Sequence, residues 1–219
     1  MESQVRGGTR WKRFAVVMVP SVAATAAIGV ALAQGALAAS FSVSGQEFKV
    51  SAGELVGHGF TQYGSLDTGK SLDGSENQAH PVAVSAFNDA SITNMCQSVV
   101  TPIPFLNKSV TLKLTAGDKG TPVAAEQLYI DVANLDAENA VFKQIDIGVA
   151  AGSATKGPKP KAGEYEKHTS SPYGFAQQAD EVTLTGVKQT AWATTAGTFK
   201  LANLHMGLSW GSGKGVECY

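Results

Sequence analysis

The sequence predicts an all-β protein built mainly from antiparallel sheets. Apolar and polar residues alternate with period two in one segment after another beyond residue 40, as in strands with one buried and one exposed face. Glycine is abundant, with 24 of 219 residues, and charged residues make up only 16%, too few for a coiled coil or a charge-driven disordered chain. We therefore expect a sandwich, a roll or a curved groove with at most short helices.

The clearest alternating segment is 110–115, where Val110, Leu112 and Leu114 share one face and threonine or lysine occupies the other. The remaining alternating segments are 41–44, 48–50, 128–132, 145–149, 182–185 and 199–201. Helix signals are few. Thr121-Pro122 followed by Glu126 resembles a capped helix start, and 136–144 has room for two turns.

The first 38 residues have the features of a secretory signal peptide with an N-terminal signal helix. Four basic residues lie among the first thirteen, 14–33 is apolar or small, and Ala36-Leu37-Ala38 is a small-x-small cleavage site. We expect cleavage after Ala38 and export by the general secretion machinery, since the arginines are not adjacent. The alternative is an uncleaved membrane anchor, because about 20 apolar residues can span a bilayer.

After cleavage, residues 39–219 form a single secreted β-rich domain. Its most distinctive loop is 152–172, which contains Lys156-Gly157-Pro158-Lys159-Pro160-Lys161. At about 20 residues it is long for a compact domain. We expect it to be an exposed, flexible connection that either divides the domain into two β units or forms a flap.

Two cysteines, Cys96 and Cys218, lie in the exported part of the chain. In an oxidising compartment two cysteines form one bridge and leave no free thiol. Cys218 is one residue from the end of the chain, where little can be built around a nucleophile. The sequence therefore predicts a Cys96–Cys218 disulfide.

The formal net charge of −1 argues against nucleic-acid binding, which needs a concentrated basic face. Among the four histidines no two have the spacing of metal ligands, and the sequence contains no Cys/His cluster. We expect no cofactor and no metal site.

One motif has the form of a catalytic signature. Gly207-Leu208-Ser209-Trp210-Gly211 matches Gly-x-Ser-x-Gly, the turn that presents the nucleophile of serine hydrolases. In those enzymes an acid and a histidine follow the serine, but no histidine follows Ser209. His205 precedes it by four residues, about 13 Å along a strand and beyond hydrogen-bond reach. We interpret the motif as a strand end and Ser209 as incidental.

The remaining histidines give weak signals. His58 lies between two glycines, a context that donates oxyanion-hole amides in some esterases, but a histidine in a turn is the favoured interpretation. His80 precedes a proline at a loop exit, and His168 lies in the 152–172 connection. No catalytic triad is visible.

Several stretches resemble a known family. They are 97–104 (QSVVTPIP), 174–180 (GFAQQAD), 189–201 (QTAWATTAGTFKL), 11–14 (WKRF) and the closing Glu217-Cys218-Tyr219. Together they resemble proteins exported by Streptomyces and related actinobacteria, commonly labelled cholesterol esterase and classed as a domain of unknown function. The resemblance implies hydrolysis of sterol esters of fatty acids, and it supplies no catalytic residues.

The family resemblance and the residue pattern therefore favour two different functions. The resemblance implies a secreted sterol-ester hydrolase, whose substrate is a lipid ester. The residues themselves favour the alternative, a non-catalytic extracellular lipid- or sterol-binding or cell-envelope protein, because one-sided apolar strands are abundant.

Overall fold

The structure is a computed structural model that describes Met18 and residues 43–219. Within these residues ten strands belong to one sheet, and every pairing between named strands is antiparallel. The prediction of a mainly antiparallel all-β fold with short helices is confirmed. The predicted signal peptide and its cleavage site lie outside the described residues, Met18 apart.

The elements follow in chain order. They are β1 (Phe48–Lys70), β2 (Asn77–Thr93), β3 (Met95–Ile103), β4 (Lys108–Ala116), β5 (Val123–Asp136), β6 (Asn139–Lys143), β7 (Asp146–Ala150), the 3₁₀ turn η1 (Ala151–Ser153), α2 (Ala162–Glu166), β8 (Phe175–Thr195), β9 (Thr198–Lys200) and β10 (His205–Trp210).

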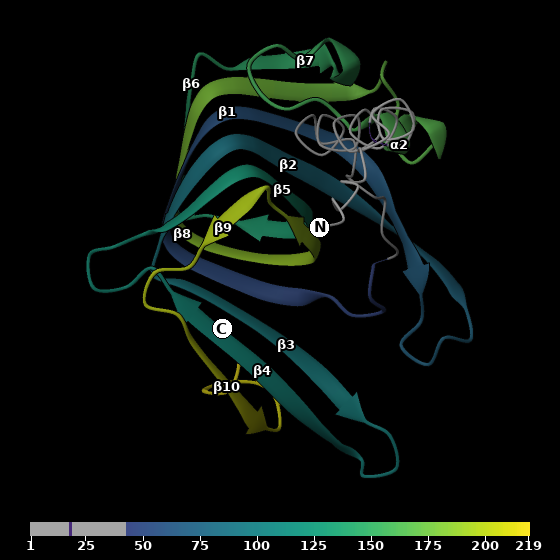
Figure 1. Cartoon of the computed structure of the whole chain (residues 1–219), viewed down its shortest axis with the longest axis vertical. Helices are drawn as coiled ribbons and strands as arrows, with labels where there is room; N and C mark the ends of the chain where they lie inside the picture. The colour runs from purple at the N-terminus through teal and green to yellow at the C-terminus, as the bar shows by residue number, and fades with distance from the viewer. Residues whose placement is uncertain (1–17, 19–42) are drawn as a thin grey trace, which may run out of the picture. The chain divides into compact units, whose positions relative to one another are not determined.

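Four of the strands close into a ring. β1 pairs with β2, β2 with β5, β5 with β8, and β8 with β1. Figure 1 shows β1, β2 and β5 side by side, with β6 and β7 beyond them. The main apolar core draws on all four ring strands, including Leu55, Phe87, Leu128 and Val182. A cavity lined by residues of these four strands together with β3 and β9 measures only about 20 Å³, so side chains fill this part of the core.

Left-handed residues interrupt the alternation of the ring strands. In β1, Leu55 and Phe60 are both buried although they are an odd number of residues apart, and Gly59 between them has φ +61°. One residue with this backbone reverses which face the following side chains take. A Cβ at Gly59 would overlap the Asn88 side chain and lie 2.9 Å from the Lys156 carbonyl oxygen, and the left-handed backbone itself disfavours any other residue, so the site favours glycine.

β3, β4 and β10 form a three-stranded extension that we call the wing. β3 pairs with β1 over three residues only, Lys49 to Ser51, and then continues with β4, which pairs with β10. In Figure 1 the wing lies below the ring, with the β3–β4 hairpin at its far end.

The Cys96–Cys218 disulfide is confirmed, with an S–S distance of 2.01 Å. It attaches the C-terminal tail to β3. The Cys218 amide donates to Ser98 Oγ at 3.2 Å, and the Lys113 ammonium donates to the Glu217 carbonyl at 3.1 Å. The Glu217 carboxylate also forms a 2.7 Å ion pair with Lys49. The tail therefore lies against one face of the wing.

The two helix signals are wrong, because β5 and β6 occupy 123–136 and 139–143. Cross-strand pairing of these segments with β2 and β8 outweighs local helix preference. Segment 152–172 carries the end of η1 and all of α2, and it packs through the buried side chains of Ala154 and Pro160. Among the described residues no helix has the length and apolar character needed to cross a membrane.

Loss of the disulfide should destabilise the fold. Its bridge closes a loop of 122 residues, and removing such a constraint lowers the free energy of unfolding by about 2–4 kcal/mol. We expect this loss for Cys96→Ser/Cys218→Ser in urea denaturation. Wild-type protein in reductant is the control and should match the variant; equal midpoints with and without the bridge would contradict the prediction.

Candidate functional site

The wing presents one apolar surface. Register pairs Met206 with Leu114, Leu208 with Leu112 and Trp210 with Val110. Directly paired residues of antiparallel strands project from the same face. Val99 of β3 pairs with Leu112 and joins the row. We call these seven residues the apolar face: Val99, Val110, Leu112, Leu114, Met206, Leu208 and Trp210.

The outer part of the apolar face is open to solvent. Met206, Leu208 and Trp210 are 55%, 71% and 67% exposed, and at its inner end Leu114 packs against the main core. The opposite face of the wing is polar and contacts the tail, since Thr111 Oγ1 donates to the Gly211 carbonyl at 2.7 Å. A contiguous exposed apolar patch on a folded protein marks an interaction site.

The β3–β4 hairpin extends this surface with an apolar tip, which we define as Phe105 and Leu106. Phe105 is fully exposed and has φ +72°. A bulky residue with this backbone is a strained outlier, and such outliers concentrate at functional sites. The Lys108 ammonium lies 6.0 Å from the centroid of the Trp210 ring, so a cation borders the aromatic end of the face.

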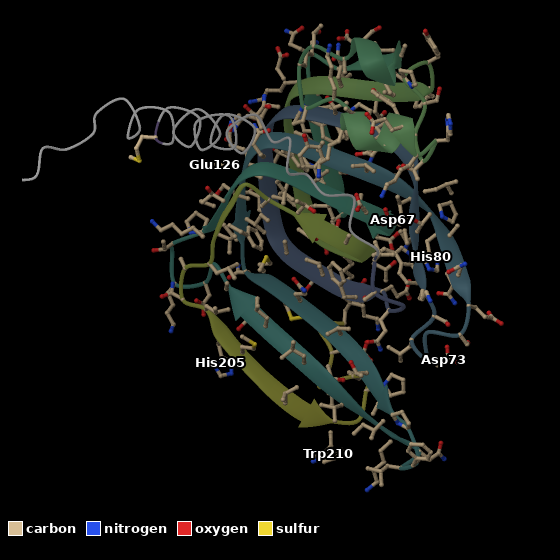
Figure 2. The ribbon with its side chains drawn as sticks, turned by 45° about the vertical axis from the view of Figure 1, so that its right-hand side comes forward. Asp67, Asp73, His80, Glu126, His205 and Trp210 are labelled. Carbon is tan, nitrogen blue, oxygen red and sulfur yellow. A yellow bond between two sulfur atoms is a disulfide. The ribbon has the colours of Figure 1, made fainter. Side chains whose placement is uncertain are left out.

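An open groove separates the tip from the β1–β2 turn. Its volume is about 1360 Å³, and its apolar lining includes Leu72, Ile103, Phe105 and Trp210. Figure 2 shows Trp210 at the end of β10 and Asp73, which also lines the groove, on the β1–β2 turn. The apolar face, the tip and the groove together form the candidate site.

A second feature is a cluster of partly buried carboxyl groups, Asp67 on β1, Asp131 on β5 and Glu164 on α2. Burial raises the pKa of all three. The charges of Asp67 and Glu164 raise the pKa of Asp131 further, while a hydrogen bond from Asp131 favours the charged form of Asp67. Both aspartates therefore keep their protons to a higher pH than an ordinary carboxyl group does.

Aromatic groups surround the cluster. The Tyr63 hydroxyl donates to Glu164 Oε1 at 3.2 Å, and burial raises the pKa of this tyrosine. His80, which pairs in register with Asp67, stacks on Trp192 with ring centroids 3.5 Å apart. Figure 2 shows Asp67 and His80 in the same region of the sheet. Among residues 43–219 no group of acidic, histidine or cysteine side chains has the arrangement of a metal site.

The structure places Ser209 on β10, exposed and paired with Thr111 on the polar face of the wing. Within the described part of the chain no hydrogen bond joins it to a histidine. The interpretation of Ser209 as incidental stays a prediction.

The expected turn at His58 is wrong, because this residue lies within β1, where its Nδ1 is 2.7 Å from Asp89 and its Nε2 is 3.9 Å from Glu181. His80 lies within β2 rather than in a loop. Glycines flank His58 and a proline follows His80, which suggests that a strand ends there. The pairing of β1 with β2 nevertheless continues through both positions.

A family model matches residues 44–219, almost all of the described chain. The chain belongs to DUF6230, a family of unknown function. The match includes both the ring and the wing of this DUF6230 protein. No curated protein and no solved structure matches the chain.

The sequence alone predicted neither the carboxyl cluster nor the exposure of the apolar face. Asp67, Asp131 and Glu164 are far apart in the DUF6230 chain and have no motif between them. The Gly-x-Ser-x-Gly motif was interpreted as a strand end, but a strand prediction gives no sign of whether the apolar face of that strand is covered or open.

Replacing Ser209 should leave any hydrolytic activity intact. Ser209→Ala removes a hydroxyl that has no base beside it, so release of fatty acid from a cholesteryl ester should stay within about twofold of wild type. Titration with a serine-directed phosphonate checks the same point. Activity that falls to background in the variant would make Ser209 the nucleophile.

The carboxyl cluster should make stability depend on pH. A carboxyl group whose pKa is raised by folding stabilises the protein below its unfolded pKa, and this stability is lost as pH rises through the folded pKa. Asp131→Asn removes that loss, so at pH 8 the variant should exceed wild type by about 1–3 kcal/mol in free energy of unfolding, with little difference at pH 4.

Asp73→Asn is the control for this comparison. Hydrogen bonds from Ser71 and Ser75 lower the pKa of Asp73 to about 2, so its replacement removes a favourable charged form. It should give no gain in stability at pH 8. Equal pH profiles for wild type and Asp131→Asn would show that the cluster does not titrate with folding.

Proposed function

We propose that this DUF6230 protein binds lipid surfaces through the apolar face and the tip. The single observation that supports this is the exposure of Met206, Leu208 and Trp210 in one row next to Phe105. Burying apolar surface contributes roughly 25 cal/mol per Å². A row of this kind therefore gains free energy when a bilayer or lipid droplet covers it.

The chemistry at the rim of the site fits a lipid headgroup region. Tryptophan is enriched at membrane interfaces, where its ring is apolar and its N–H remains hydrated. Lys108, beside the Trp210 ring, has an apolar stem and a charged end that can reach phosphate. The tip would then enter the acyl region while Lys108 stays at headgroup depth.

Binding to a surface is supported over enclosure of a ligand. The cavity in the core is about 20 Å³, whereas pockets for small molecules measure about 300–1,000 Å³. A sterol or acyl chain would therefore contact the groove and the apolar face. Secretion, with the N-terminal segment as signal peptide, would bring these surfaces to extracellular lipid.

Sterol-ester hydrolysis is the second candidate, and it comes from the resemblance to actinobacterial proteins labelled cholesterol esterase. The observation that favours it is the His58–Asp89 pair, because a carboxylate 2.7 Å from a histidine nitrogen orients the ring as a general base. The same surface would hold such an enzyme at an ester-containing interface.

Flotation with phosphatidylcholine vesicles that contain cholesteryl oleate tests binding. Wild type should float with the vesicles, and Phe105→Ser/Leu106→Ser should raise the apparent Kd at least about tenfold, since it removes two exposed apolar side chains from the tip. Tyr173→Ser is the matched control, because Tyr173 is 91% exposed but lies outside the candidate site. Its affinity should equal wild type.

Quenching by brominated lipids adds a depth measurement. In a Trp11→Phe/Trp192→Phe background Trp210 is the one remaining tryptophan. Its fluorescence should be quenched on binding when Phe105 and Leu106 are intact, and not in Phe105→Ser/Leu106→Ser. Equal flotation of all variants would contradict the assignment of the apolar face. Fatty-acid release in the same samples distinguishes an enzyme from a protein that only binds lipid.

A further inference from the structure

The outer edge of β10 is open for strand pairing. Gly211 N–H donates to the Ser109 carbonyl at 2.8 Å, which continues the β10–β4 register by one pair. By alternation, 205, 207 and 209 are also hydrogen-bonded to β4. The N–H and C=O groups of Met206, Leu208 and Trp210 therefore point away from β4, and in the described part of the chain no other strand pairs with them.

This edge lacks the features that normally prevent association. The strand reads His-Met-Gly-Leu-Ser-Trp and has no proline, lysine or acidic residue. The opposite edge of the wing differs, because Pro102 lies in β3 and the Gln46 side chain donates to the Val100 carbonyl at 2.7 Å. One edge of the wing is thus closed to pairing and the other is open.

We propose that β10 pairs with β10 of a second copy of this chain, antiparallel and centred on Leu208. In this register Leu208 faces Leu208 of the second copy, and Met206 faces Trp210. All the outward-pointing groups of the three residues then find partners, in about six hydrogen bonds. The interface is isologous, as two-fold dimers require.

The side chains of this register are mutually compatible. Leucine packs on leucine at the axis, and each methionine sulfur lies beside a tryptophan ring, a favourable contact. On the other face Gly207 meets Ser209, which leaves room for close approach. The paired wings would form one six-stranded sheet with the two apolar faces on the same side, so the dimer presents a doubled surface.

Oligomeric state in the absence of lipid tests the proposal independently of lipid binding. Light scattering after size exclusion should give wild type twice the mass of one chain at protein concentrations of roughly tens of micromolar. Leu208→Pro removes the outward N–H without affecting the β4 hydrogen bonds, and should raise the dimer Kd at least about tenfold. Leu112→Ser changes the apolar face but not the edge, and should remain a dimer.

Cysteine cross-linking tests the register and does not depend on a destabilising variant. Leu208→Cys places two thiols across the axis, with Cα atoms about 5.5 Å apart, within disulfide range. Met206→Cys and Trp210→Cys place their own pairs about 13 Å apart, too far to join. We expect a covalent dimer for Leu208→Cys alone, with Cys96–Cys218 retained.

Two results would overturn the proposal. One is a wild-type protein with the mass of a single chain. Cross-linking mass spectrometry that finds another segment of the same chain next to β10 would explain such a result and would equally exclude the dimer. The other is equal cross-linking at all three positions, which indicates random collision. A monomeric wild type that still floats with the vesicles would leave the proposed function standing while the dimer proposal fails.

Discussion

β1 is paired along both of its edges, and the arrangement of the other strands depends on this. One edge pairs with β8 from Phe48 to Tyr63, and the other pairs first with β3 and then with β2. Because β5 pairs with both β2 and β8, the two edges of β1 are joined through it into a ring. The ring leaves no edges between its own members, and its interior is filled by side chains from every strand.

The position of the wing also depends on pairing with β1. β3 pairs with β1 over three residues, so the rest of the β3–β4 hairpin extends beyond the ring and receives β10 as its third strand. The disulfide and the Lys49–Glu217 ion pair then hold the tail against the polar face. The other face has no comparable cover among residues 43–219. The open apolar face is the physical basis of the lipid-binding proposal, and the unpaired outer edge of β10 is the basis of the dimer proposal.

Periodicity predicted the wing strand better than the ring strands. Segment 110–115 alternates cleanly, and the structure has β4 there. β1 was recognised only at its start, since Gly53, Gly57 and Gly59 suggest turns, whereas the strand continues through all three. Gly59 combines a left-handed backbone with strand pairing on both edges, and local sequence gives no sign of that combination. Segment 128–132 of β5 was predicted as a strand, whereas the start of β5 and all of β6 gave helix signals, because their strand partners are distant in sequence.

The sequence by itself determined the fold class and the disulfide. Alternation with period two is a local property of each strand, and two cysteines allow only one bridge within the chain. Tertiary structure alone decided which faces are covered. The carboxyl cluster joins Asp67, Asp131 and Glu164 from three separate elements, and the exposure of Leu208 and Trp210 depends on what packs against the wing. Both are consequences of long-range pairing, in which contact is set by strand register rather than by distance along the chain.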